Sequence, residues 1–133
     1  MSTFAFAAQA VSVGIPASTW VGVSGERPSG ADIFDHLTAT AVLLEQAGWE
    51  PTFERDLSAA MRVARAQGVG DEDTQVVGRD LMEQILRVHL NAPYAQVDAW
   101  AEKPGRQLAE LLDLLAAAAE LADSYGPAKA VAR

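Results

Sequence analysis

The chain has 133 residues, of which 50% are hydrophobic and 21% are charged, and it contains no cysteine. This composition excludes a disordered chain, a disulfide-stapled fold and cysteine chemistry, and the length favours a single domain with one hydrophobic core. The formal net charge of -8 argues against general binding to nucleic acids or anionic membranes, whose phosphates would repel it. No apolar run reaches the roughly 18 to 20 residues of a membrane span. The first 14 residues also lack the Lys or Arg of a signal peptide, so we expect a cytoplasmic protein.

Residues 1–30 form an almost uncharged segment that predicts an N-terminal β-hairpin or extended arm. Its apolar side chains alternate with small or polar ones at the period of two that is typical of strands, at Phe4, Phe6, Val11, Val13, Val21 and Val23. Gly14 and Pro16 between these stretches indicate a turn. Because a lone hairpin is marginal in water, we expect the arm to be buried against the helices or against another chain.

Residues 31–126 show the helical period and predict a bundle of about five helices. The expected helices are one from the cap Ser29 to Gly48, one from the cap Thr52 to Gly68, one from the acidic turn 71–73 to Asn91, a short one with Val97 and Trp100, and one from Leu108 to Gly126. Residues 127–133 are expected to form a frayed tail. The alanine run 116–119 permits close helix approach, either within the chain or at a dimer seam.

The three tryptophans of the chain lie outside the long predicted helices. Trp49 follows the end of the first long helix, and Trp100 precedes the start of the last one, so both are expected to be structural plugs over the ends of the bundle. Pro104 and Gly105 then redirect the chain into the last helix and are also expected to be structural. Trp20 lies in the low-charge arm, where it serves either the chain's own core or a partner.

Candidate chemistry centres on His36. Asp32 and Asp35 lie close to it in sequence, which suggests a general acid/base pair or a lone metal site beside the alternative of an exposed histidine next to acids. The di-metal pattern of helical bundles needs a Glu three residues before each His, and Ile33 and Leu86 occupy those positions instead. We therefore expect no metal, no cofactor and no catalytic residue, and the acids of residues 71–73 are expected to cap a helix.

The pair Gly48–Trp49 after an amphipathic helix, and Trp100 followed by Pro104, Gly105, Arg106 and a Leu-Leu-Asp helix, resemble a family of small actinobacterial and actinophage domains of unknown function. The resemblance covers about residues 33–122. Such domains often show Trp-Asn-Asp before Pro-Gly-Arg-Thr and a central segment with Cys, whereas this chain has Ala101–Glu102, Gln107 and a cysteine-free segment 57–61. The resemblance implies a helical fold and no particular reaction.

These observations favour a non-catalytic protein-interaction or regulatory module whose first partner is a second copy of itself, with a host or phage protein as a further partner. The expected interaction surface comprises Phe4, Phe6, Trp20, Val23 and Arg106. One alternative is a small-molecule-binding or enzymatic bundle that uses His36 with Asp32 or Asp35. Another is an acidic inhibitor that mimics nucleic acid.

Overall fold

The computed structural model describes residues 3–50 and 56–129 of the chain, and these residues are mainly helical. The α-helices are α1 (Ala5–Val13), α2 (Gly30–Ala47), α3 (Leu57–Ala66), α4 (Glu72–Leu90), α5 (Val97–Ala101) and α6 (Leu108–Tyr125), and a 3-10 turn, η1, covers Ala17–Trp20. The described residues contain no strand. The mainly α-helical fold is therefore confirmed.

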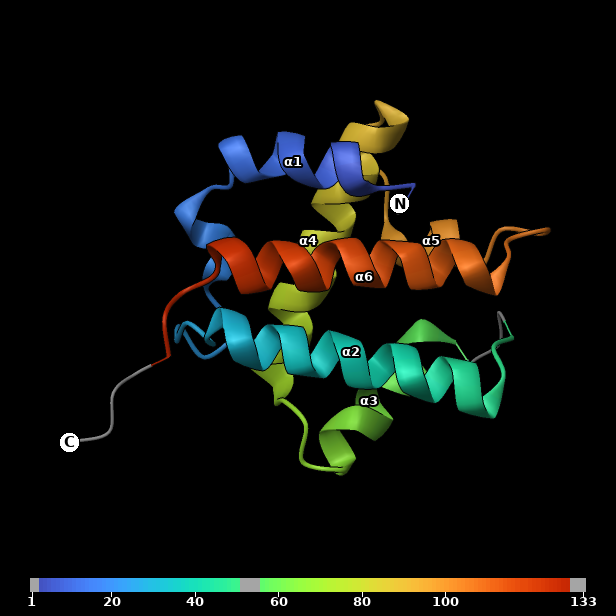
Figure 1. Ribbon diagram of the computed structural model, residues 1–133, viewed down its shortest axis with the longest axis horizontal. Coiled ribbons are helices and arrows are strands. Elements are labelled where there is room, and N and C mark those ends of the chain that lie inside the picture. The colour runs from blue at the N-terminus through green and yellow to red at the C-terminus, as the bar shows by residue number, and fades with distance from the viewer. Residues whose placement is uncertain (1–2, 51–55, 130–133) are drawn as a thin grey trace.

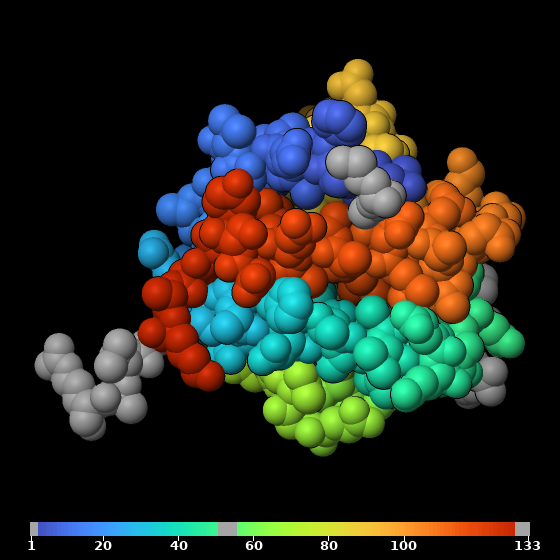
Figure 2. All heavy atoms as spheres, viewed as in Figure 1, coloured from blue at the N-terminus to red at the C-terminus, as the bar shows by residue number. Residues whose placement is uncertain are grey.

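Helix α6 lies at the centre of the visible layer, between α1 on one side and α2 on the other (Figures 1 and 2). Helix α2 runs antiparallel to α6, α4 crosses behind these helices, and α3 packs against α2 on the side away from α6 (Figure 1). The core lies between the crossing α4 and the layer in front of it, and its fully buried side chains include Ile33, Leu37, Leu81, Ile85 and Leu114. No helix in residues 3–50 or 56–129 is both long enough and apolar enough to cross a bilayer.

Small residues bring α2 and α6 into close contact. A Cβ atom added at Gly30 would overlap the backbone carbonyl oxygen of Ala122, and the Gly30 N–H donates a hydrogen bond to the carbonyl of Pro127 at 2.8 Å. Residues 117–119 of the alanine run are buried inside this chain, whereas Ala116 is exposed. The run therefore serves close packing within the chain.

The expected β-hairpin in residues 1–30 is wrong, because residues 5–13 form the helix α1. Alanine occupies four of its nine positions and is the strongest helix former. Phe4, Ala7 and Val11 follow the helical period of three and four residues, and all three are buried in the same core as the rest of the bundle. The alternation of apolar residues at period two was coincidental, since a buried helical face supplied the stronger constraint.

The segment after α1 is also attached to the bundle. Pro16 precedes the 3-10 turn η1, whose Trp20 is buried and whose Thr19 hydroxyl accepts a hydrogen bond from the Gln84 amide of α4 at 2.6 Å. Trp20 therefore belongs to the chain's own core, which settles the choice that its sequence context left open.

The helices of residues 31–126 begin and end close to the expected positions. The Ser29 hydroxyl accepts a hydrogen bond from the Asp32 N–H at 3.0 Å, and α2 ends before Gly48, whose φ of 77° suits glycine. Asp71 caps α4 together with Thr74, as the acidic turn predicted. The expected cap Thr52 lies outside the described residues, and Asp56 caps α3 by accepting from the Ala59 N–H.

The expected frayed tail is described only as far as residue 129. Within that part Pro127 bonds to Gly30, and the Lys129 ammonium lies 3.8 Å from the Asp32 carboxylate. The beginning of the tail is thus in contact with the start of α2.

Replacing Gly30 by Ala is expected to lower the free energy of unfolding by about 1 to 3 kcal/mol, because the added methyl group must push α2 and α6 apart. Gly14→Ala is the matched control: its φ is -134°, and no atom lies within 4 Å of the added Cβ. We expect the control to change stability by no more than about 0.5 kcal/mol. Chemical denaturation followed by circular dichroism measures both, and equal stability of the two variants would contradict the close packing.

Candidate functional site

The imidazole of His36 is fully buried on the inner face of α2, so the expectation of an exposed histidine is wrong. His36 lies one turn after Ile33 and one before Thr40, both of which also face the core. Its Nδ1 lies 2.9 Å from the carbonyl oxygen of Val69. Because that oxygen can only accept, Nδ1 carries the proton and Nε2 is the unprotonated nitrogen of a neutral ring. Nε2 is buried and has no hydrogen-bond partner among the described residues.

The loop before α4 closes over this ring. Gly70 has a φ of 87°, and a Cβ atom there would lie 2.9 Å from Nδ1 of His36, so glycine is needed for this close passage. Burial lowers the pKa of His36, the bond to Val69 and the charge of Asp71 oppose this effect, and the nearby Arg65 adds to it. The ring is therefore enclosed and neutral.

The structure does not bring His36 together with Asp32 or Asp35. The Asp32 carboxylate pairs with Lys129 at the surface, and Asp35 is exposed. In the part of the chain that the structure describes, no three His, Cys, Asp or Glu side chains are grouped closely enough to hold a metal ion. His36 consequently has the contacts of a core residue.

A second cluster surrounds the buried indole of Trp100 in α5. The Phe4 ring lies edge-on to it with centroids 5.7 Å apart, and the Arg106 guanidinium lies over it, 3.9 Å from its ring centroid. Arg106 also donates through Nε to the Trp100 carbonyl oxygen at 2.9 Å and pairs with Glu110 at 2.6 Å. The Arg106 side chain is only 14% exposed, so most of it is occupied within the chain rather than offered to a partner.

The other residues expected to be structural are Pro104 and Gly105, between α5 and α6, and Trp49, after α2. Pro104 is exposed, and Gly105 adopts a φ of 86°, which lets the chain turn from α5 into α6. Trp49 packs half-buried against the core after α2, and its indole nitrogen has no acceptor among the described residues. At the start of α6 the Gln107 N–H donates to the Glu110 carboxylate, and this bond, with Arg106, lowers the pKa of Glu110.

The expected interaction residues separate into two groups. Phe4 and Trp20 lie in the core, and Arg106 is held against Trp100. Phe6 is 80% exposed on α1, and Val23 is exposed in the loop before α2. Val13 at the end of α1, one of the apolar residues of the expected arm, is 90% exposed, and Tyr94 after α4, which sequence reasoning did not select, is 89% exposed. Val13 follows Phe6 by seven residues, so the helical period would have placed both on one face.

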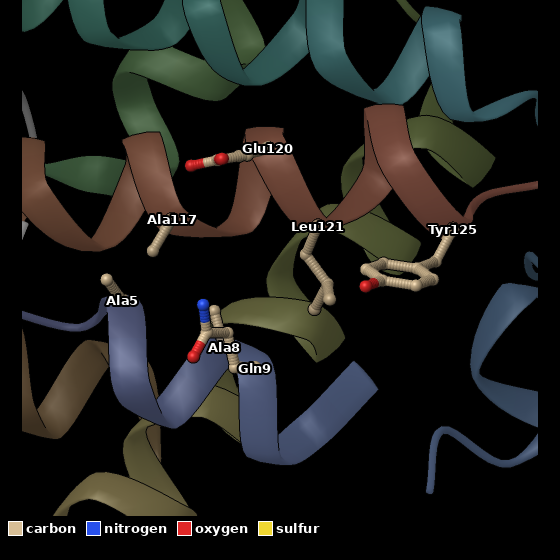
Figure 3. Close-up of a pocket in the computed structure, with 7 residues that line it drawn as sticks. All are labelled: Ala5, Ala8, Gln9, Ala117, Glu120, Leu121 and Tyr125. Atoms are coloured by element: carbon tan, nitrogen blue, oxygen red, sulfur yellow. The ribbon is translucent and has the colours of Figure 1, made fainter. Parts of the chain in front are cut away.

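A groove runs between α1 and α6 beside this exposed face, with a volume of about 150 Å³. Figure 3 shows Ala117 and Leu121 of α6 pointing toward α1, where Ala5 and Ala8 complete the wall. Gln9, Glu120 and Tyr125 also line it, and Figure 3 shows the Gln9 amide on the side of α1 that faces α6. The groove, together with the exposed Phe6 and Val13 of α1, is the candidate site.

Comparison with known proteins places most of the chain in a known group. Residues 28–121 match the model of a family described only as a family of unknown function, DUF6197. No curated protein and no solved structure matches the chain. The matched residues run from just before α2 into α6, close to the region of the resemblance, whereas α1 lies before them. The actinobacterial or phage origin stays a prediction.

The enclosed His36 predicts acid sensitivity. Unfolded histidine titrates near a pKa of about 6.5, and the folded pKa is lower, so below that pH the unfolded state binds a proton that the folded state does not. This contribution to stability is complete above about pH 7 and falls on acidification by at most about 1.4 kcal/mol per pH unit until the folded pKa is reached.

His36→Asn is the control for this prediction, because its amide can still donate to Val69 but cannot gain a proton. We expect the free energy of unfolding to fall more steeply between about pH 7 and 5 in the natural protein than in the variant. Urea denaturation at each pH measures this free energy. If it fell equally with pH in the natural protein and in the variant, the pKa of His36 would be the same in the folded and unfolded states.

Trp100→Ala is expected to destabilise the protein by about 3 to 5 kcal/mol, because it removes a buried indole from between Phe4 and Arg106. Tyr94→Ala serves as the matched aromatic control, since Tyr94 is almost fully exposed, and should change stability by no more than about 0.5 kcal/mol. Thermal and chemical denaturation measure both variants. If Trp100→Ala left the stability unchanged, Trp100 would not be the structural residue that we expect.

Proposed function

We propose that this chain, which belongs to the DUF6197 family of unknown function, is a non-catalytic protein-interaction module that associates with a second copy of itself through α1. One observation carries the proposal: α1 is apolar on both of its faces. Phe4, Ala7 and Val11 lie in the core at one side, and Phe6 and Val13 are 80% and 90% exposed at the other. Large apolar side chains that gather on a helix outside its core-facing stripe are typical of an interaction surface.

The cost of leaving this face in water supports the proposal. Apolar surface removed from water contributes roughly 25 cal/mol per Å², and aromatic side chains bury the largest areas. The last turn of α4 lies beside the start of α1, as the 4.6 Å separation of the Phe4 and His89 rings shows. Val88 and Leu90 of that turn are also exposed.

Charge favours a second copy as the partner. Two chains of net charge -8 repel each other over most of their surfaces, but the first 25 residues contain no Asp, Glu, Lys or Arg. The α1 face is thus where two acidic copies meet with little repulsion. A two-fold axis through such a contact brings the same patch of each copy together, which is the commonest arrangement of homo-oligomers.

The two alternative functions have less support. An enzymatic or small-molecule-binding role for His36 would need access to a ring that is enclosed by Val69 and Gly70. A nucleic-acid mimic would need free acids in a row, whereas several acids are engaged with cations, as in Arg79–Asp98 and Arg106–Glu110. A cytoplasmic location and a host or phage protein as a further partner remain part of the proposal.

Replacing both Phe6 and Val13 by Ser is expected to raise the dissociation constant of the homodimer by roughly tenfold or more, because aromatic anchors dominate protein contacts. Sedimentation velocity over a wide concentration range measures the association, and circular dichroism checks that the helices persist. Added salt should strengthen the natural dimer by screening the acids.

Val42→Ser is the control for the loss of an exposed apolar side chain, since Val42 lies on α2 and is also exposed. It should leave the dimer intact. The proposal fails if the natural protein stays monomeric at every concentration, or if its dimer is unaffected by the changes at Phe6 and Val13.

A further inference from the structure

We infer that the groove between α1 and α6 receives the phenyl ring of Phe6 from a second copy of the chain, an inference that rests on the proposed self-association. In a two-fold dimer each copy then contributes one ring and one groove. This contact between ring and groove would specify which surfaces of the two copies meet, whereas the proposed function names only α1.

The size of the groove fits this occupant. Its volume is about 150 Å³. An apolar protein cavity of about 150 Å³ is large enough to bind benzene, which has the ring of a phenylalanine side chain. A larger indole or a whole helix would not enter a space of this volume without moving α1.

The chemistry of the walls fits as well. Ala5 and Ala8 from α1 and Ala117 and Leu121 from α6 form the aliphatic part of the lining, and these four side chains have no polar atom that an entering ring would take out of water. The polar part of the lining is formed by Gln9, Glu120 and Tyr125. Glu120 and Tyr125 are exposed, so their polar atoms stay in contact with water when a ring occupies the apolar part.

The position of Phe6 on α1 explains why the ring must come from another copy. Consecutive residues of a helix point about 100° apart, so Phe6 projects beside the groove whose wall includes its neighbour Ala5. The ring is accordingly 80% exposed instead of filling the groove of its own chain. Since ring and groove lie at the same level of one helix, a two-fold axis parallel to α1 inserts both rings at once.

The test fills the groove without changing the exposed face. Ala8→Leu places a larger side chain in the groove wall, and Ala116→Leu makes the same change on the exposed side of α6, outside this groove. We expect Ala8→Leu to raise the dissociation constant of the dimer by roughly tenfold or more and Ala116→Leu to change it by less than about twofold. Sedimentation velocity measures the dimer, and thermal unfolding confirms that each variant folds.

A double-mutant cycle and a ligand probe complete the design. If Phe6 fills the groove, combining Phe6→Ser with Ala8→Leu weakens the dimer no more than either change does alone. Benzene should in addition shift the methyl NMR signals of Ala117 and Leu121 in the monomeric Phe6→Ser variant.

The outcomes separate this inference from the function on which it rests. A dimer that is weakened by Phe6→Ser but not by Ala8→Leu, or additive effects of the two, would overturn the groove as the receptor and leave self-association standing. Absence of any dimer would overturn both.

Discussion

The edge-on contact between Phe4 and Trp100, with ring centroids 5.7 Å apart, determines where the N-terminal helix lies on the bundle. The Arg106 guanidinium lies over the Trp100 ring and also bonds to the Trp100 backbone and to Glu110 at the start of α6. One indole thus connects α1, α5 and α6. Because Phe4 is drawn inward, the next residue but one, Phe6, is turned outward on the same helix. The exposed ring on which the proposed function depends is a consequence of the buried one.

The alanine-rich sides of α1 and α6 have a related double effect. Toward α2, the backbones of the two helices meet at Gly30, where an added Cβ atom would overlap the carbonyl oxygen of Ala122. Toward α1, the small side chains Ala5, Ala8 and Ala117 line a groove of about 150 Å³. Small residues therefore allow backbone contact between α2 and α6 and also line the groove between α1 and α6. The larger side chains Phe4 and Val11 pack in the core beneath α1.

The two candidate sites differ in accessibility, and this difference decides between them. His36 has the chemistry that catalysis would use, but its ring is covered by the loop at Val69 and Gly70, and its Nε2 has no partner among the described residues. The face of α1 has almost no reactive groups, yet it presents apolar surface directly to water. The second feature supports the interaction role that we propose, while the first describes a neutral core histidine whose protonation opposes folding.

The sequence by itself determined the helices between Ser29 and Gly126, because caps such as Ser29 and Asp71 and the glycine at position 48 act on the backbone within one or two turns. It also indicated that residues 1–25 contain no charged side chain. Only the tertiary structure decided that residues 5–13 are helical, since an alanine-rich segment with Phe4 and Val11 fits either period until α4 and α6 offer it a surface. The burial of His36 was likewise beyond local reasoning, because the loop at Gly70 that covers it lies more than 30 residues away in sequence. Which face of α1 remains in water, and with it the candidate site, depends on such contacts between distant segments.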